Sequence, residues 1–168
     1  MGQLLISLPL FLVLSVIQTV AISRIEILAG SGDIVLLAII SWIITDEEGN
    51  YLGWAIIGGF LVSILSALPL AATILIYLTV AVIAKIAARI FWQSPILSLL
   101  ISAGLSTILK FLIEIFTLQF LGIPAPFLLS LTSILLPTML LNLFYAFPIY
   151  VLMGDISHWL SPKDEIYA

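Results

Sequence analysis

Apolar residues form six runs in this sequence, separated by short breaks that carry charge, proline or glycine. A helix that crosses a bilayer needs about 20 consecutive apolar residues, with a range of about 17–25. We predict spans over residues 4–22, 34–44, 54–68, 70–90, 96–121 and 127–153. The pattern predicts an all-α, polytopic membrane protein: one bundle of six transmembrane helices, followed by a polar tail over residues 154–168.

The composition excludes several classes of protein. Of the 168 residues, 63% are hydrophobic and 8% are charged, whereas soluble domains contain about 45–50% apolar and about 25% charged residues. Five cationic side chains are too few for a phosphate-binding surface, so we expect no nucleic-acid partner. With no Cys and one His, we expect no metal and no cofactor. No nucleophile has a His base in reach, and we expect a protein that is not an enzyme.

The second span is unusually short. Eleven residues reach only about half of a hydrocarbon core roughly 30 Å thick. Either the Gly30–Asp33 segment dips into the membrane, or this helix packs inside the bundle, where the mismatch matters less. Asp33 is placed to cap its N-terminus.

Lys and Arg residues set the expected orientation, because cytoplasmic loops carry an excess of them. With six spans, Lys85, Arg89 and Lys163 share one side and Arg24 lies on the other. We therefore expect both termini in the cytoplasm. The four tryptophans fall near the same face, as in an interfacial aromatic belt: Trp42, Trp54, Trp92 and Trp159.

The fifth run carries a polar face with residues four apart: Ser98, Ser102, Ser106, Lys110 and Glu114. Lys110 and Glu114 are spaced for an ion pair, and ionisable groups at membrane depth face the protein interior. The pair is either part of an ion or proton path, or a satisfied ion pair that fixes helix packing. We favour the second, because a proton relay normally has more than one carboxylate at depth.

Other polar or small residues indicate helix contacts. Asn142 and Gln18 need hydrogen-bond partners inside the membrane; each belongs either to a ligand site or, as we favour, to an interhelical contact. The third run carries a stripe of small residues: Ala55, Gly59, Ser63 and Ala67. We expect this stripe and the stripe of Ser98, Ser102 and Ser106 to be candidate contacts with a partner helix, with at least one of them used inside the bundle.

The order of these features resembles the MreD family, small multi-spanning subunits of the bacterial cell-elongation machinery. The segments that carry the resemblance are Ser31–Leu37, Gly59–Leu70, Leu136–Leu143 and Phe147–Tyr150. Asp33 matches the Asp of the family's Arg-Pro-Asp, while Gly32 replaces its Pro. Ser63 stands where the family often has an Asp in the middle of a Gly-rich helix.

The resemblance implies a non-enzymatic scaffold in the bacterial inner membrane. Members of this family pair with MreC and connect MreB filaments to the RodA glycosyltransferase and a class B penicillin-binding protein. They thereby position peptidoglycan synthesis and maintain rod shape. The family fold also resembles the substrate-binding subunits of energy-coupling-factor vitamin transporters.

That second likeness supplies a rival function, a transporter subunit that binds a vitamin. Such subunits dock through Ala-x-x-x-Ala motifs in the first helix, and residues 10–18 here lack one. The loops around Pro69 and residues 122–126 also offer little polarity for a ligand. The sequence therefore favours the scaffold.

Overall fold

The computed structural model describes residues 2–20, 28–46 and 50–160, and in these ranges every regular element is a helix. The elements are α1 (Gly2–Val20), α2 (Ile34–Thr45), α3 (Tyr51–Leu65), α4 (Leu70–Ile90), α5 (Pro95–Phe120), α6 (Phe127–Ser130), the π-helical turn η2 (Leu131–Leu135) and α7 (Leu136–Leu160). The last three follow one another without a break. The predicted all-α class is confirmed for the described residues.

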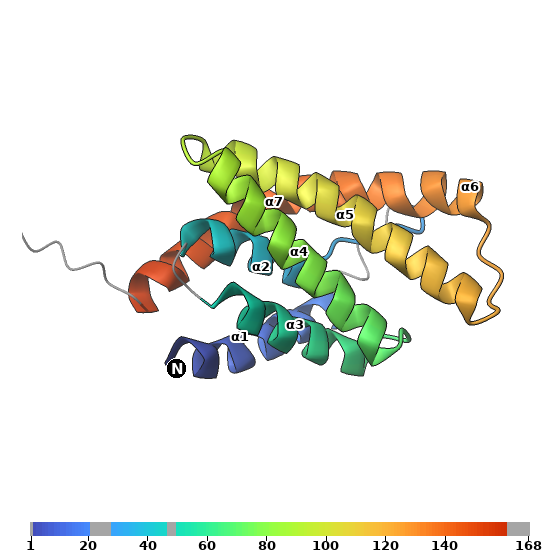
Figure 1. Ribbon diagram of the computed structural model, residues 1–168, viewed down its shortest axis with the longest axis horizontal. Helices are drawn as coiled ribbons and strands as arrows, with labels where there is room; N and C mark the ends of the chain where they lie inside the picture. Colours follow the sequence, from blue (N-terminus) through green and yellow to red (C-terminus); the bar gives the residue numbers. More distant parts are fainter. Residues whose placement is uncertain (1, 21–27, 47–49, 161–168) are drawn as a thin grey trace, which may run out of the picture.

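Successive long helices run in alternate directions across the bundle (Figure 1). The start of α1, the turn between α4 and α5 and the end of α7 lie at one end of the molecule. The ends of α1 and α3 and the starts of α4 and α6 lie toward the other. We call the second end the distal end.

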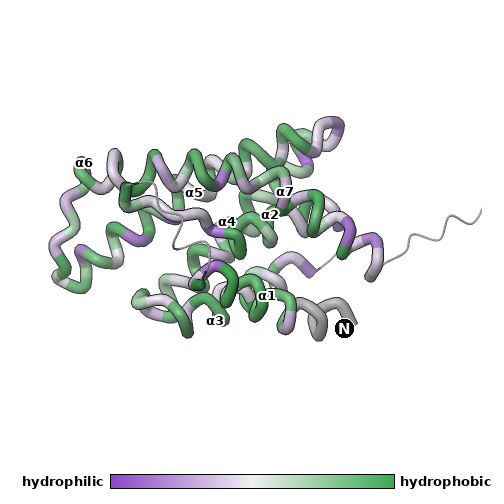
Figure 2. Tube along the Cα trace, turned by 180° about the vertical axis from the view of Figure 1, so that it is seen from behind, coloured by the Kyte–Doolittle hydropathy of each residue, from purple (hydrophilic) through white to green (hydrophobic). Residues whose placement is uncertain are grey.

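Three of the described helices are long and apolar enough to cross a membrane: Leu70–Ile90, Pro95–Phe120 and Phe127–Trp159. Their outward sides expose large apolar side chains, such as Phe116, Leu140 and Phe144 at 64%, 65% and 74%. Hydrophilic stretches along the chain are short (Figure 2). Soluble monomers rarely expose apolar surface on this scale. The fold and its exterior therefore define a helical membrane protein, while a count of six spans stays a prediction.

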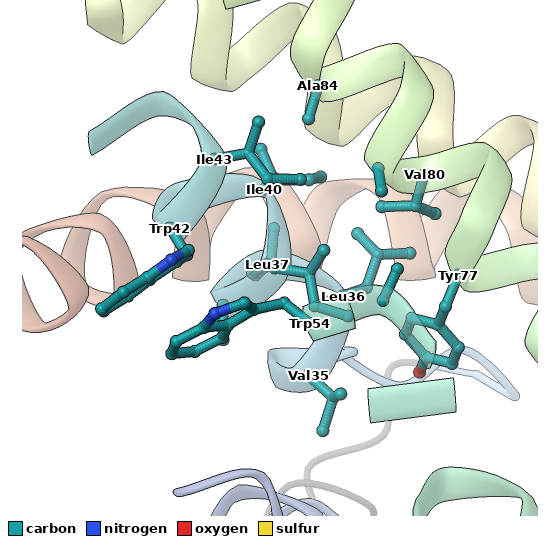
Figure 3. Packing of buried hydrophobic residues seen from close by; sticks show 14 of the residues in the cluster. Val35, Leu36, Leu37, Ile40, Trp42, Ile43, Trp54, Tyr77, Val80 and Ala84 are labelled. Carbon is teal, nitrogen blue, oxygen red and sulfur yellow. The ribbon is translucent and has the colours of Figure 1, made fainter. Parts of the chain in front are cut away.

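Helix α2 forms the centre of the bundle. Its 12 residues would extend about 18 Å, and the side chains from Ile34 to Ile44 are all buried. It contacts α1, α3, α4, α5 and α7, as its labelled side chains in Figure 3 illustrate. A helix that is apolar on every face is stable only when surrounded. Of the two explanations for its short length, packing inside the bundle is therefore the one observed.

Two of the four tryptophans do not belong to an interfacial belt. Trp42 and Trp54 are 1% and 0% exposed, and their rings stack with centroids 3.8 Å apart. Phe11 packs edge-on against Trp54 at 5.3 Å. The belt prediction is wrong for this pair, because the burial of α2 draws both indoles into the core. Trp92 and Trp159 are exposed, as a belt position requires.

The segment before α2 docks where the π-helical turn η2 meets α7 in the last long helix. Pro137 has no N–H to donate to the carbonyl of Ser133, four residues earlier in the chain. That carbonyl instead accepts a hydrogen bond from the backbone N–H of Ala29 at 3.0 Å. The π-helical turn η2 immediately precedes α7 at this point, and proline is a common cause of such departures from regular helix geometry.

Helix α7 continues to Leu160 and does not stop at residue 153. The start of the predicted polar tail is therefore a continuation of this helix. Several residues used in the sequence predictions lie outside the described residues: the end of the first span at 21–22, Arg24 and the tail from 161, including Lys163.

Replacing Gly30 tests whether the segment before α2 docks against the last long helix. A Cβ at Gly30 would lie 2.7 Å from the Thr138 nitrogen and 2.8 Å from the Ile134 oxygen, both backbone atoms. We expect Gly30→Ala to lower the free energy of unfolding by at least about 1–3 kcal/mol, since the helix cannot yield as a side chain would. The measurement is reversible unfolding in mixed micelles.

Gly154→Ala is the matched control, because a Cβ there meets nothing within 4 Å. Ala is the better helix former, so this variant should be as stable as the wild type or slightly more stable. Equal stability of the two variants would contradict the docking of Gly30.

Candidate functional site

Asp33 lies at the N-terminus of α2 and is the most buried charged residue described, with 1% of its surface exposed. Its Oδ1 accepts a hydrogen bond from the backbone N–H of Leu36 at 2.9 Å. This is the N-cap that the sequence predicted. The cap also fixes the carboxylate at the point where the central helix begins.

Two further helices supply donors to this carboxylate. Lys110 of α5 forms an ion pair and a short hydrogen bond with Oδ2 of Asp33. The hydroxyl of Tyr77 in α4 donates to the same oxygen at 3.1 Å. A buried carboxylate without partners is very unfavourable. The carboxylate of Asp33 therefore links α2, α4 and α5.

Asn142 of α7 joins the network from the other side. Its Oδ1 accepts a hydrogen bond from the backbone N–H of Asp33 at 2.7 Å. Its Nδ2 donates to Oγ1 of Thr107 in α5 at 2.9 Å. Asn142 is fully buried and bridges α7, α5 and the segment before α2. This is the interhelical contact that we favoured over a ligand site.

Gln18 of α1 completes the N-terminus of α2. Its Oε1 accepts a hydrogen bond from the backbone N–H of Val35 at 3.1 Å. The first N–H groups of a helix have no partner within the helix, and a bilayer offers no water to them. Asp33, Gln18 and Asn142 therefore satisfy backbone donors at and before the start of α2 from within the protein. We call Gln18, Asp33, Tyr77, Thr107, Lys110 and Asn142 the polar junction.

Glu114 is a secondary partner of Lys110. Its Oε1 lies 3.7 Å from Nζ, and its side chain is 29% exposed. The ion pair expected from the i,i+4 spacing is present, but the main partner of Lys110 is Asp33, 77 residues earlier. Helical spacing reports only local neighbours, so it could not reveal this partner.

The predicted partner stripes are largely inside the bundle. Ser98, Ser102 and Ser106 are all 0% exposed, and their hydroxyls have no hydrogen-bond partner. Ala55 and Gly59 are also buried, and a Cβ at Gly59 would lie 3.2 Å from the Cα of Ile74 in α4. A partner helix cannot reach these residues in this structure. Only the end of the α3 stripe is accessible, with Ser63 half-buried and Ala67 exposed.

Two cavities border Lys110 and Glu114. The larger has a volume of about 200 Å³ and lies between α1, the end of α3, the start of α4 and α5. The smaller, of about 150 Å³, lies between α5, the Ala29–Ser31 segment and the start of α7. Lys110 and Glu114 line both cavities, whereas Asp33 lines neither. The cavities therefore give access to Lys110 and Glu114 but not to the buried carboxylate of Asp33.

Sequence reasoning missed Tyr77 as a member of the junction and gave Thr107 no partner. Tyr77 is the one Tyr in the middle of the fourth run. A buried Tyr hydroxyl usually finds a polar partner, which was the available signal. Thr107 also donates to the carbonyl of Ala103 at 2.7 Å, a bond within its own helix. Its contact with Asn142 depends on tertiary packing alone.

The class defined by the fold is a helical membrane protein with a buried polar junction. No protein-family model, no curated protein and no solved structure matches this chain.

The burial of Asp33 predicts unequal effects for changes at its neighbours. Lys110→Met leaves a buried carboxylate without its cation, and we expect a loss of roughly 3–5 kcal/mol in the free energy of unfolding. Glu114→Gln removes a longer, partly exposed contact and should cost less than about 1 kcal/mol. Both are measured by reversible unfolding in mixed micelles. A larger loss of stability in Glu114→Gln than in Lys110→Met would show that Asp33 is not the main partner of Lys110.

Proposed function

We propose that this chain is a non-enzymatic scaffold subunit of the cell-elongation machinery in a bacterial inner membrane. In this role it pairs with MreC and links MreB filaments to RodA and a class B penicillin-binding protein. It crosses the membrane six times, with both termini in the cytoplasm. The start of α1 and the end of α7 lie at the same end of the bundle, which is consistent with an even number of spans (Figure 1).

The observation that carries the proposal concerns the residues of the MreD resemblance. Asp33 and Asn142 belong to the polar junction. Gly59 allows α3 and α4 to approach closely, and Pro137 lies at the docking point of Gly30. These residues all fix helix packing. A scaffold needs such a fixed bundle, whereas an enzyme needs reactive groups placed around a substrate.

Of the small-residue stripe that starts in α3, only the end is accessible to a partner helix. Ser63 and Ala67 lie near the distal end of α3, where Ser63 is half-buried and Ala67 exposed. Small residues allow a partner helix to approach closely in a bilayer. In the proposed orientation this end faces away from the cytoplasm, toward the side on which the extracytoplasmic part of MreC lies.

One observation favours the rival function of a vitamin-binding transporter subunit. The larger cavity is lined by charged and polar side chains, among them Lys110, Glu114 and Gln18. Its volume of about 200 Å³ is below the roughly 300–1,000 Å³ of pockets for drug-sized ligands. A vitamin of that size would require the helices to move apart, so the scaffold remains the better supported function.

Depletion of the chain in its bacterial host separates the two functions. We expect rod-shaped cells to become round on depletion and to recover with the wild-type chain. Gly30→Ala should fail to restore shape and Gly154→Ala should succeed, because only the first disturbs the bundle. The measurements are cell width by microscopy and uptake of labelled vitamins. Normal shape together with failed vitamin uptake would refute the scaffold.

A further inference from the structure

The larger cavity contains polar groups that the junction does not use. Ser15 lines it and is almost fully buried at 3% exposure, and its hydroxyl has no hydrogen-bond partner. A buried hydroxyl without a partner is costly. Gln18 and Tyr77 also line the cavity, but each already makes a hydrogen bond to α2 or to Asp33. Ser15 is therefore the polar group that a ligand would satisfy.

The charges at the cavity do not balance. Asp33 and Glu114 are two carboxylates, and Lys110 is the one cation in contact with either of them among the described residues. Lys110 bonds primarily to Asp33, and its distance to Glu114 is 3.7 Å. With all three groups ionised, the cluster carries one surplus negative charge at Glu114. Water-poor surroundings strengthen the attraction of such a charge for a cation.

The size and walls of the cavity restrict the cation. A cavity of about 200 Å³ is somewhat larger than the roughly 150 Å³ cavity that holds benzene, so the ligand has about ten non-hydrogen atoms or fewer. Val62, Leu65 and Ile76 provide apolar walls. A short alkyl chain fits these walls. A primary ammonium brings three donors for the Glu114 carboxylate and the Ser15 hydroxyl.

We propose that the cavity between α1, α3, α4 and α5 binds a primary ammonium group on a short apolar stem, with Glu114 as its counter-ion and Ser15 as a hydrogen-bond acceptor. The group comes either from a free small amine or from the ethanolamine headgroup of a lipid that reaches the cavity from the bilayer. This site is independent of the scaffold role. Its failure would leave the proposed function in place, and the reverse also holds.

The test uses the full chain purified in a nonionic detergent, with n-propylammonium chloride as the probe. We expect a saturable rise in the unfolding temperature and a dissociation constant on the order of millimolar, the range that a ligand of four heavy atoms can reach. 1-Propanol is the neutral analogue of the same size, and sodium chloride matches the ionic strength. A rise of equal size with either compound would overturn the proposal.

Two variants assign the contacts. Glu114→Gln should weaken propylammonium binding at least tenfold, and the Asp33–Lys110 pair that it leaves is neutral, so the bundle should fold. Ser15→Ala should weaken binding severalfold. Ser102→Ala is the matched control, because Ser102 is also buried and its hydroxyl also lacks a partner, but it does not line the cavity. Unchanged binding in Glu114→Gln, or an equal loss in Ser102→Ala, would overturn the site.

Lipid nanodiscs distinguish the two sources of the group. If the source is a lipid, phosphatidylethanolamine should stabilise the wild type relative to phosphatidylcholine with the same acyl chains, compete with propylammonium, and have no such effect on Glu114→Gln. If the source is a free amine, propylammonium should stabilise the wild type equally in both lipids. No propylammonium effect in detergent and no lipid difference in nanodiscs would refute the proposal.

Discussion

A single buried carboxylate constrains much of this bundle. Asp33 is 1% exposed, and an unpaired charge in such a place would cost several kcal/mol. Its side chain must therefore be reached by Lys110 and Tyr77, while its backbone N–H is held by Asn142. These partners come from α5, α4 and α7, so the relative positions of three long helices depend on the place where α2 begins.

The same place accommodates backbone that is not helical. Such a segment needs partners for its peptide groups inside the protein, because a lipid environment offers none. Ala29 donates to the carbonyl of Ser133, which lies where Pro137 cannot donate, and Gly30 fits against the backbone beside it. The π-helical turn in the last long helix and the irregular segment before α2 therefore satisfy each other's backbone groups, so α2 can be short and start inside the bundle.

Much of the polar junction could be predicted from the sequence, because polar residues are rare in its apolar segments. Asp33, Lys110, Asn142 and Gln18 were recognised for this reason, and the structure brings them together. Their pairing could not be predicted: the i,i+4 rule assigned Lys110 to Glu114, while the contact with Asp33 spans 77 residues. The same limit applies to the stripe of Ser98, Ser102 and Ser106. A spacing of four residues identifies one face of a helix, but it does not tell whether the helix packed against that face belongs to the same chain.

A double-mutant cycle between Asp33→Asn and Lys110→Met tests most directly whether this pair joins α2 to α5. The free energy of unfolding is measured in mixed micelles for the wild type, both single variants and the double variant. We expect the double variant to lose less free energy of unfolding than the two single variants lose in sum. The difference, which is the coupling energy of the pair, should exceed about 1.5 kcal/mol. Additivity within about 0.5 kcal/mol would contradict the central role of the pair.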